Sequence, residues 1–199
     1  MRTVLLALSL VVACGGGGGG GVSATATAPT ADAVSGAAPA AAAPAAAPGL
    51  APRPFTAEQI RVAMPVGTEI RYRLEETGKP AVIVHSKVTV ADAAAMTMVS
   101  RVLAEDGSVL SEEPARTTRW DDLLKHASFP ADHTKRSQGK VEVPAGTFET
   151  LDYVVTESAN GATTVTTFRF ATALPGPPVS LVVEKGGAVV QRMTLLSRK

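Results

Sequence analysis

Alternation of apolar and polar residues is the dominant pattern from Glu69 onward. In Glu69–Glu75, Ile70, Tyr72 and Leu74 fall on one face and charged side chains on the other, as in a half-buried strand. The pair Asp106-Gly107 is typical of a hairpin turn. By the same criteria, Val82, Val84, Val88 and Val90 should share one face of a second strand, Met96, Met98 and Val102 one face of a third, and Val109-Leu110 should start a fourth.

Short strands separated by turn residues also fill the second half of the chain. Phe168 and Phe170 should share a face, and Asn160-Gly161 and Gly186-Gly187 should form turns. The predicted strands are 140–143, 148–155, 163–170, 179–185 and 188–196.

Two segments have the spacing of short helices instead. Thr56 and Gln59 form a capping-box pattern that opens a helix from Ala57 to about Met64. A second helix is expected after Thr118 as the cap, with Trp120, Leu123 and Leu124 on one stripe. The predicted fold is mainly β: a single, highly curved antiparallel sheet or open half-barrel of eight or nine strands, with helix packed on or into it. Two packed sheets are the alternative.

The N-terminus has the pattern of an export signal. Met1-Arg2-Thr3 is followed by an apolar run of ten residues, Val4–Ala13, whereas a membrane-spanning helix needs ~20. The run ends at Val11-Val12-Ala13-Cys14, which resembles the lipobox of bacterial lipoproteins. The resemblance implies that the thiol of Cys14 is acylated, that residues 1–13 are removed, and that the new amine is acylated too. Two or three acyl chains on one residue hold a protein to a bilayer almost permanently, whereas one holds it marginally.

Residues 14–54 are predicted to be a lipidated cysteine followed by a disordered tether. Gly15–Gly21 has a high entropy cost of ordering, and Pro39, Pro44 and Pro48 would each interrupt a helix in the alanine-rich stretch that follows. The folded domain is predicted to span residues 55–199. Because Gly15 is not the aspartate that tends to retain lipoproteins at the inner membrane, the outer membrane of a Gram-negative envelope is the expected location.

Charge is balanced in the predicted domain. The chain has 19 basic and 18 acidic residues, and Arg2, Asp32 and Arg53 lie outside residues 55–199, which leaves 17 of each sign. A formally neutral domain offers no basic face for nucleic acid. Since Cys14 is the only cysteine, the domain must be held together by packing without an internal disulfide.

A second resemblance concerns the C-terminal part of the chain. Val143-Pro-Ala-Gly-Thr-Phe148, followed by Phe168-Arg-Phe170 and Leu174-Pro-Gly-Pro-Pro-Val179, resembles envelope lipoproteins and domains of unknown function that carry a V-P-A-G-T-F turn. Several of these are thought to share the half-barrel of the lipoprotein carrier and receptor proteins, which move acyl chains across the periplasm. The resemblance covers about Gly139–Ser197 and implies a fold. No site residues follow from it.

A search for catalytic or metal-binding patterns gives only weak candidates. His126, Asp132 and His133 could ligate zinc, but their spacing matches no standard zinc motif, so a helix end and a polar loop are favoured. Adjacent Asp121 and Asp122 point about 100° apart on a helix and cannot form a dyad. His85 lies opposite the valine face, where it should be solvated. We therefore expect no cofactor, no metal and no enzymatic activity.

Two further groups have a structural and a functional interpretation each. The stripe Trp120, Leu123, Leu124 is expected to plug the concave face of the sheet, the alternative being a partner or lipid contact. Met64, Met96, Met98 and Met193 are expected to fill the core, the alternative being an adaptable apolar pocket.

Three functions remain open at this point. The first is a membrane-anchored, non-enzymatic envelope lipoprotein that binds an apolar ligand or lipid. The second is a structural or assembly lipoprotein that docks a protein partner in the envelope. The third, a hydrolase, would need a histidine, a carboxylate and a serine to converge from distant segments. A filled core or an apolar cavity of ~300 Å³ inside the sheet would separate the first two.

Overall fold

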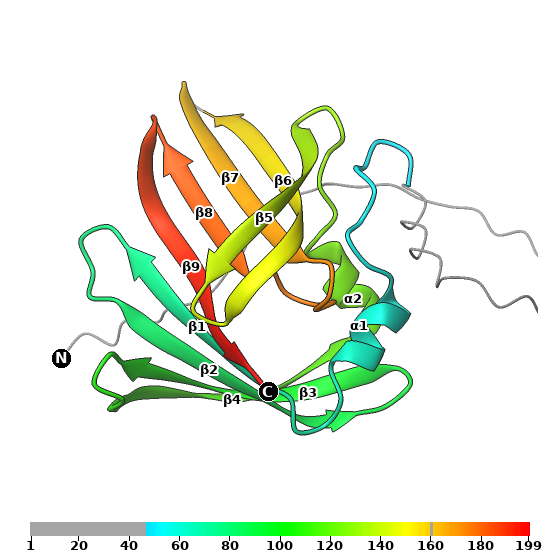
Figure 1. Ribbon diagram of the computed structural model, residues 1–199, viewed down its shortest axis with the longest axis vertical. Coiled ribbons are helices and arrows are strands. Elements are labelled where there is room, and N and C mark those ends of the chain that lie inside the picture. Colours follow the sequence, from blue (N-terminus) through cyan, green and yellow to red (C-terminus); the bar gives the residue numbers. More distant parts are fainter. Residues whose placement is uncertain (1–46, 160) are drawn as a thin grey trace, which may run out of the picture. The chain divides into compact units, whose positions relative to one another are not determined.

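The computed structural model describes residues 47–159 and 161–199, in which nine strands form one antiparallel sheet with the order β4-β3-β2-β1-β9-β8-β7-β6-β5. The sheet is curved and does not close into a barrel, which confirms the expected fold class (Figure 1). The first and last strands, β1 and β9, are neighbours, and they join two meanders of consecutive hairpins. The strands are β1 (Glu69–Glu76), β2 (Val82–Ala91), β3 (Ala95–Ala104), β4 (Val109–Arg119), β5 (Thr134–Val143), β6 (Gly146–Ala159), β7 (Ala162–Ala171), β8 (Ser180–Lys185) and β9 (Ala188–Arg198).

Two short helices, α1 (Ala57–Ala63) and α2 (Trp120–Lys125), contact each other beside the sheet (Figure 1). The predicted capping box of α1 is present: Gln59 N–H donates to Thr56 Oγ1 at 3.1 Å, and Thr56 N–H donates to Gln59 Oε1 at 2.8 Å. The predicted cap of α2 was wrong. Thr118 stays in strand β4, paired with Met96, and Arg119 takes the N-cap position without a side-chain bond. The ladder with β3 holds the chain extended one residue further than the capping pattern suggested.

Aromatic side chains form the centre of the core. The ring of Phe129 lies 5.3 Å from that of Tyr153 and 4.7 Å from that of Phe168, and Phe170 meets Phe55 edge-on at 6.2 Å. Phe168 and Phe170 stack on one face of β7, as their spacing predicted. Ile70 and Leu74 of β1 are buried on the same inner side, which confirms the clearest alternating segment of the sequence.

A register shift corrects the predicted inner face of β2. Val88 is 1% exposed and pairs with Met98, but the next pair is Val90 with Thr97, so Thr89 is an extra residue on β2. The shift turns Val90 away from the core, and its exposure is 51%. A bulge reverses the alternation of inner and outer residues from that point on. Counting every second residue along β2 therefore placed Val90 on the wrong face.

Strands β4 and β5 are the two edges of the sheet, and both are longer than their apolar residues predicted. The sequence indicated only Val109-Leu110 and Lys140–Val143, whereas the strands span Val109–Arg119 and Thr134–Val143. Most residues of both strands are exposed, so their added length lacks the apolar alternation that reveals a buried face.

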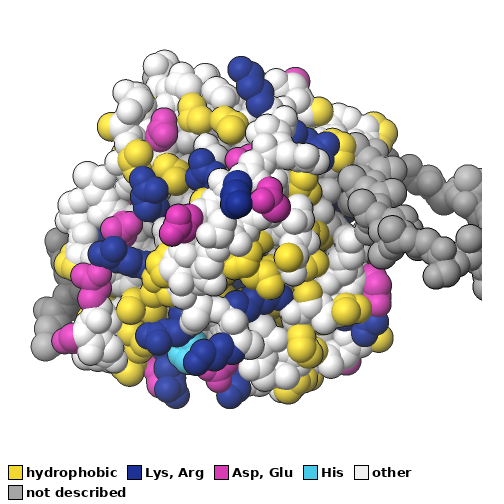
Figure 2. Space-filling model, viewed as in Figure 1, with side chains coloured by type: hydrophobic (Ala, Val, Ile, Leu, Met, Phe, Trp, Pro, Cys, Tyr) yellow, Lys and Arg dark blue, Asp and Glu magenta, His cyan; other side chains and the backbone are white. Residues whose placement is uncertain are grey.

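Figure 2 shows charged side chains of both signs interspersed with apolar ones over the visible face of the domain.

The V-P-A-G-T-F turn joins β5 to β6 and reaches across the inside of the sheet. Val143 pairs with Gly146, whose φ of +134° favours glycine, and Ala145 N–H donates to Leu195 O of β9 at 3.4 Å. Val143, Ala145 and Phe148 pack against the core. The motif therefore links the β5–β6 hairpin to β9 and to the core, which is a structural role.

The Leu174–Pro178 loop is held by two side chains of distant strands. Tyr72 Oη donates to Pro178 O at 2.9 Å, and burial raises the pKa of the Tyr72 hydroxyl. The guanidinium of Arg198 donates to Leu174 O at 3.3 Å, to Pro175 O at 3.2 Å and to Ala63 O at the end of α1. Burial lowers the pKa of Arg198. The partly buried guanidinium of Arg198 thus fastens the loop and α1 to β9.

Ordered packing begins before Phe55, where the domain was predicted to start. Residues 47–54, called the N-terminal strap below, belong to the predicted tether but lie on the domain, and Ala51 is 4% exposed. Tyr153 Oη donates to Pro52 O at 2.6 Å. The strap is short and rich in Ala and Pro, so its composition matches that of the predicted tether. Only its contacts with the domain distinguish the strap from the tether. The predicted signal peptide and the rest of the predicted tether lie outside the described residues.

Candidate functional site

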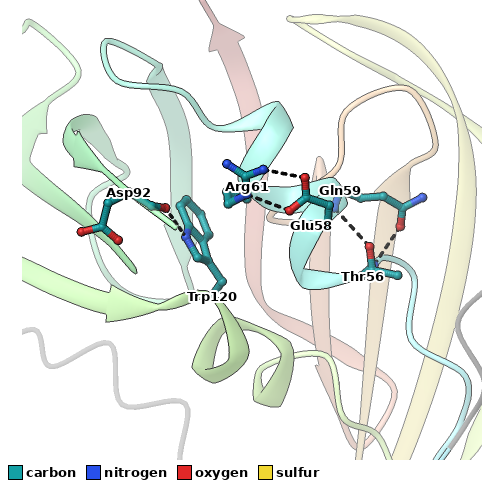
Figure 3. Close-up of polar contacts among 6 residues, drawn as sticks. All are labelled: Thr56, Glu58, Gln59, Arg61, Asp92 and Trp120. Atoms are coloured by element: carbon teal, nitrogen blue, oxygen red, sulfur yellow. Dashed lines mark hydrogen bonds and ion pairs between the residues drawn. The ribbon is translucent and has the colours of Figure 1, made fainter. Parts of the chain in front are cut away.

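A surface depression of about 310 Å³ lies where α1, α2 and the β2–β3 turn meet (Figure 3). Its walls combine small side chains with charges of both signs. The lining residues are Ala57, Glu58, Arg61, Ala93, Ala94, Arg119, Trp120 and Asp121.

The start of α2 is tied to the β2–β3 turn by hydrogen bonds. Trp120 Nε1–H donates to Asp92 O at 2.9 Å, and Trp120 N–H donates to Ala94 O at 3.1 Å. The carboxylate of Asp92 accepts from the N–H groups of Ala95 at 2.8 Å and Ala94 at 2.7 Å, and these bonds hold its pKa below the ordinary value. The buried indole therefore fixes one wall of the depression relative to the sheet.

The opposite wall carries an ion pair on α1. Arg61 donates to Glu58 through Nε at 2.7 Å and through Nη2 at 2.6 Å, and this bond lowers the pKa of Glu58 (Figure 3). Both side chains are largely exposed, so the pair contributes little to stability and opens at low cost. Such a pair can exchange its internal contact for one with a polar partner.

The lining is polar and carries charges of both signs. It contains no histidine, cysteine or serine that could serve as a base or nucleophile. Two carboxylates, two guanidinium groups and three alanines line it, a combination that suits a complementary polar protein surface. This depression is our candidate site.

A second depression of about 280 Å³ lies at the far ends of β1 and β9. It is shallower and also mixed in polarity. The lining residues are Glu75, Glu76, Thr77, Val189, Val190, Gln191 and Arg192. Like the first, it is a surface feature and does not have the apolar walls of a lipid pocket.

The weak candidates from the sequence do not come together in one site. His126 is the C-cap of α2, His133 is exposed with Nε2 3.4 Å from Asp132 Oδ2, and His85 contacts Glu69 across the sheet at the same distance. Within residues 47–159 and 161–199, no three potential ligands among His, Cys, Asp and Glu come together as a metal site. The two aspartates separate as predicted: Asp122 pairs with Lys125, and Asp121 lines the depression.

The plug and core-filling interpretations are confirmed. Trp120 is 3% exposed in the core cluster, with Leu123 and Leu124 packed against it. Met64 and Met96 are buried, and Met98 and Met193 pack partly buried against the same cluster.

Sequence reasoning singled out Trp120 and Asp121 but missed Glu58, Arg61 and Asp92 as parts of the candidate site. Glu58 and Arg61 stand three residues apart on a predicted helix, a spacing that indicates an ion pair. Asp92 precedes three alanines, a pattern in which an aspartate accepts from nearby backbone N–H groups in a turn. These local signals were present in the sequence. The residues that carry them lie side by side only because α1 packs against α2 in the folded chain.

Cys14, the predicted lipidation site, lies outside the described residues. Among the residues that the structure describes, no helix is both long and apolar enough to cross a bilayer. Comparison of the chain with known protein families, with characterised proteins and with solved structures found no match.

Proposed function

We propose that this chain is a non-enzymatic lipoprotein of the bacterial cell envelope. In this proposal, acyl chains on Cys14 anchor it at the outer membrane and residues 15–46 space it from the bilayer. The domain docks a protein partner through the depression between α1, α2 and the β2–β3 turn. The lipobox pattern at Val11–Cys14 supports the anchor.

The single observation behind docking is that Trp120, Met64 and Met96 fill the concave side of the sheet beneath the helices. A carrier of acyl chains needs apolar volume of ~300 Å³ or more to bury its ligand. Both depressions that we describe have charged walls instead. Packing and polarity therefore favour a protein partner over an apolar ligand.

Crosslinking in intact cells tests the docking proposal. A photoreactive amino acid in place of Ala94, in the wall of the depression, should trap one dominant protein neighbour. The matched control carries the same amino acid at Lys185, an exposed residue at the end of β8. We expect the adduct at Ala94 to exceed that at Lys185 at least tenfold. Scattered neighbours at Ala94, or equal adducts at both sites, would contradict docking at this depression.

Binding of an apolar ligand remains the alternative, and Trp120 reports on it. This side chain is the only tryptophan and lies against the inside of the sheet. If the proposal is right, oleate below its critical micelle concentration should leave the tryptophan emission of the protein unchanged within about 5%. The reason is that a filled interior has no room for an acyl chain. A saturable change in emission, together with acyl species that copurify, would restore the carrier alternative.

A further inference from the structure

The N-terminal strap lies on the domain in the way a bound peptide lies on its receptor. A turn at Ala47–Leu50 starts it: Leu50 N–H donates to Ala47 O at 3.0 Å, and Gly49 has a φ of +75°. Leu50 then forms an antiparallel bridge with Pro130. Ala51 N–H donates to Phe129 O at 2.8 Å, and Ala131 N–H donates to Gly49 O at 3.0 Å. Main-chain bonds of this kind are typical of an added strand.

Side chains complete the contact at defined positions. Ala51 is 4% exposed, so a larger side chain at this position would have to displace its neighbours. Tyr153, itself 0% exposed, donates its hydroxyl to Pro52 O, and Arg53 Nη2 donates to Ser128 Oγ at 3.1 Å. The domain thus contacts the strap through the strap's backbone, through the small side chain of Ala51 and through the guanidinium of Arg53.

The receptor side of this contact is held by the core rather than by the strap. Phe129 is packed on Tyr153 and Phe168, and Tyr153 belongs to β6, which is paired on both sides. Ser128 Oγ donates to Leu124 O at 3.0 Å, which fixes the residue after α2. A groove built in this way should keep its shape when the strap leaves, as a preorganised binding site requires.

We propose that residues 128–131 and Tyr153 form a groove for extended peptides of the type Leu-Ala-Pro-Arg-Pro, which the strap fills in cis. A partner that carries such a segment binds by displacing the strap. The groove shares no residue with the lining of the depression between α1, α2 and the β2–β3 turn, so the inference adds a second binding site to the proposed docking function and names the chemistry of its ligand. A covalently attached strap competes at an effective concentration on the order of millimolar, so it suppresses weak trans binding.

Peptide binding to the full chain tests this groove. All chains carry Cys14→Ser to avoid acylation, and the probe is a fluorescein-labelled octapeptide with the sequence of Ala47–Pro54. Ala51→Asp should dislodge the strap, because a carboxylate has no partner in the alanine pocket. Fluorescence anisotropy should show saturable binding of the octapeptide to the Ala51→Asp chain. Its dissociation constant should be at least tenfold lower than that for the chain with Ala51. Val62→Asp, at a residue 66% exposed on α1, should bind as weakly as the chain with Ala51.

Two measurements make the result decisive. Far-UV circular dichroism checks the fold, and Ala51→Gln replaces Ala51→Asp if the aspartate variant unfolds. Hydrogen exchange of the Ala131 amide should accelerate when the strap leaves, because that amide is bonded to Gly49. The proposal is overturned if both variants keep this amide protected, if neither binds the peptide, or if a peptide with Ala51→Asp binds equally well. Because these assays use purified chain, their failure leaves the crosslink at Ala94 as a separate test of docking.

Discussion

Replacing Cys14 with serine should abolish incorporation of radiolabelled palmitate into this protein and leave residues 1–13 attached. A hydroxyl is a far weaker nucleophile than a thiolate, so the acyl chains that the lipobox implies would have no attachment atom. Label in the immunoprecipitated protein should fall to background, and intact mass should show a chain that retains its signal sequence. No other substitution that we propose has an all-or-none expected effect.

The matched control for Cys14 is Ser23→Ala, in the same N-terminal segment. It removes a nearby hydroxyl that could itself carry an ester, and it should take up label like the unaltered chain. Persistent label in Cys14→Ser, or an unlabelled parent chain, would refute the lipid anchor. The proposed location in the envelope would then lose its support.

Trp120→Ala should lower the free energy of unfolding by about 3–5 kcal/mol, the cost of removing a large buried ring that neighbours cannot replace. It also removes the N–H donor to Asp92 O, so the β2–β3 turn loses its link to α2. For a domain of this size the loss corresponds to a fall in melting temperature on the order of 10 °C. Circular dichroism must report it, because the variant has no tryptophan left.

Two controls separate the contributions of Trp120. Trp120→Phe keeps an aromatic ring but loses the donor, so we expect a cost of about 1–2 kcal/mol. Val62→Ala, at an exposed site on the neighbouring helix, should change stability by less than about 0.5 kcal/mol. A melting temperature for Trp120→Ala equal to that of Val62→Ala would mean that α2 does not plug the sheet.

Alternation predicted the strands whose inner face is buried. β1 is the clearest case: Ile70 and Leu74 are buried, Tyr72 packs against the core, and the charged residues between them lie on the other face and are partly exposed. The edge strands β4 and β5 were predicted too short because they have little buried face for the alternation to reveal. Their added residues are exposed, so no hydrophobic period marks them, and the backbone pairing with β3 and β6 extends them.

Local patterns predicted less of the candidate site. The capping box of α1 and the burial of Trp120 were readable, because each depends on residues within one turn of helix. The depression itself joins α1, α2 and the β2–β3 turn, three segments that are brought together only by packing. The same holds for Arg198, whose guanidinium reaches Ala63 from the other end of the chain.

The sequence by itself determined an antiparallel, curved, mainly β domain, because period-two hydrophobicity and turn residues are local properties. It also predicts an export signal that ends in a lipobox-like pattern, from the apolar run at Val4–Ala13. The tertiary structure decided that β1 pairs with β9, that Val90 turns outward and that residues 47–54 belong to the domain. Each of these depends on contacts between distant residues. Burial of Ala51 against the segment before β5 stabilises the strap, and nothing in its own composition distinguishes it from the tether.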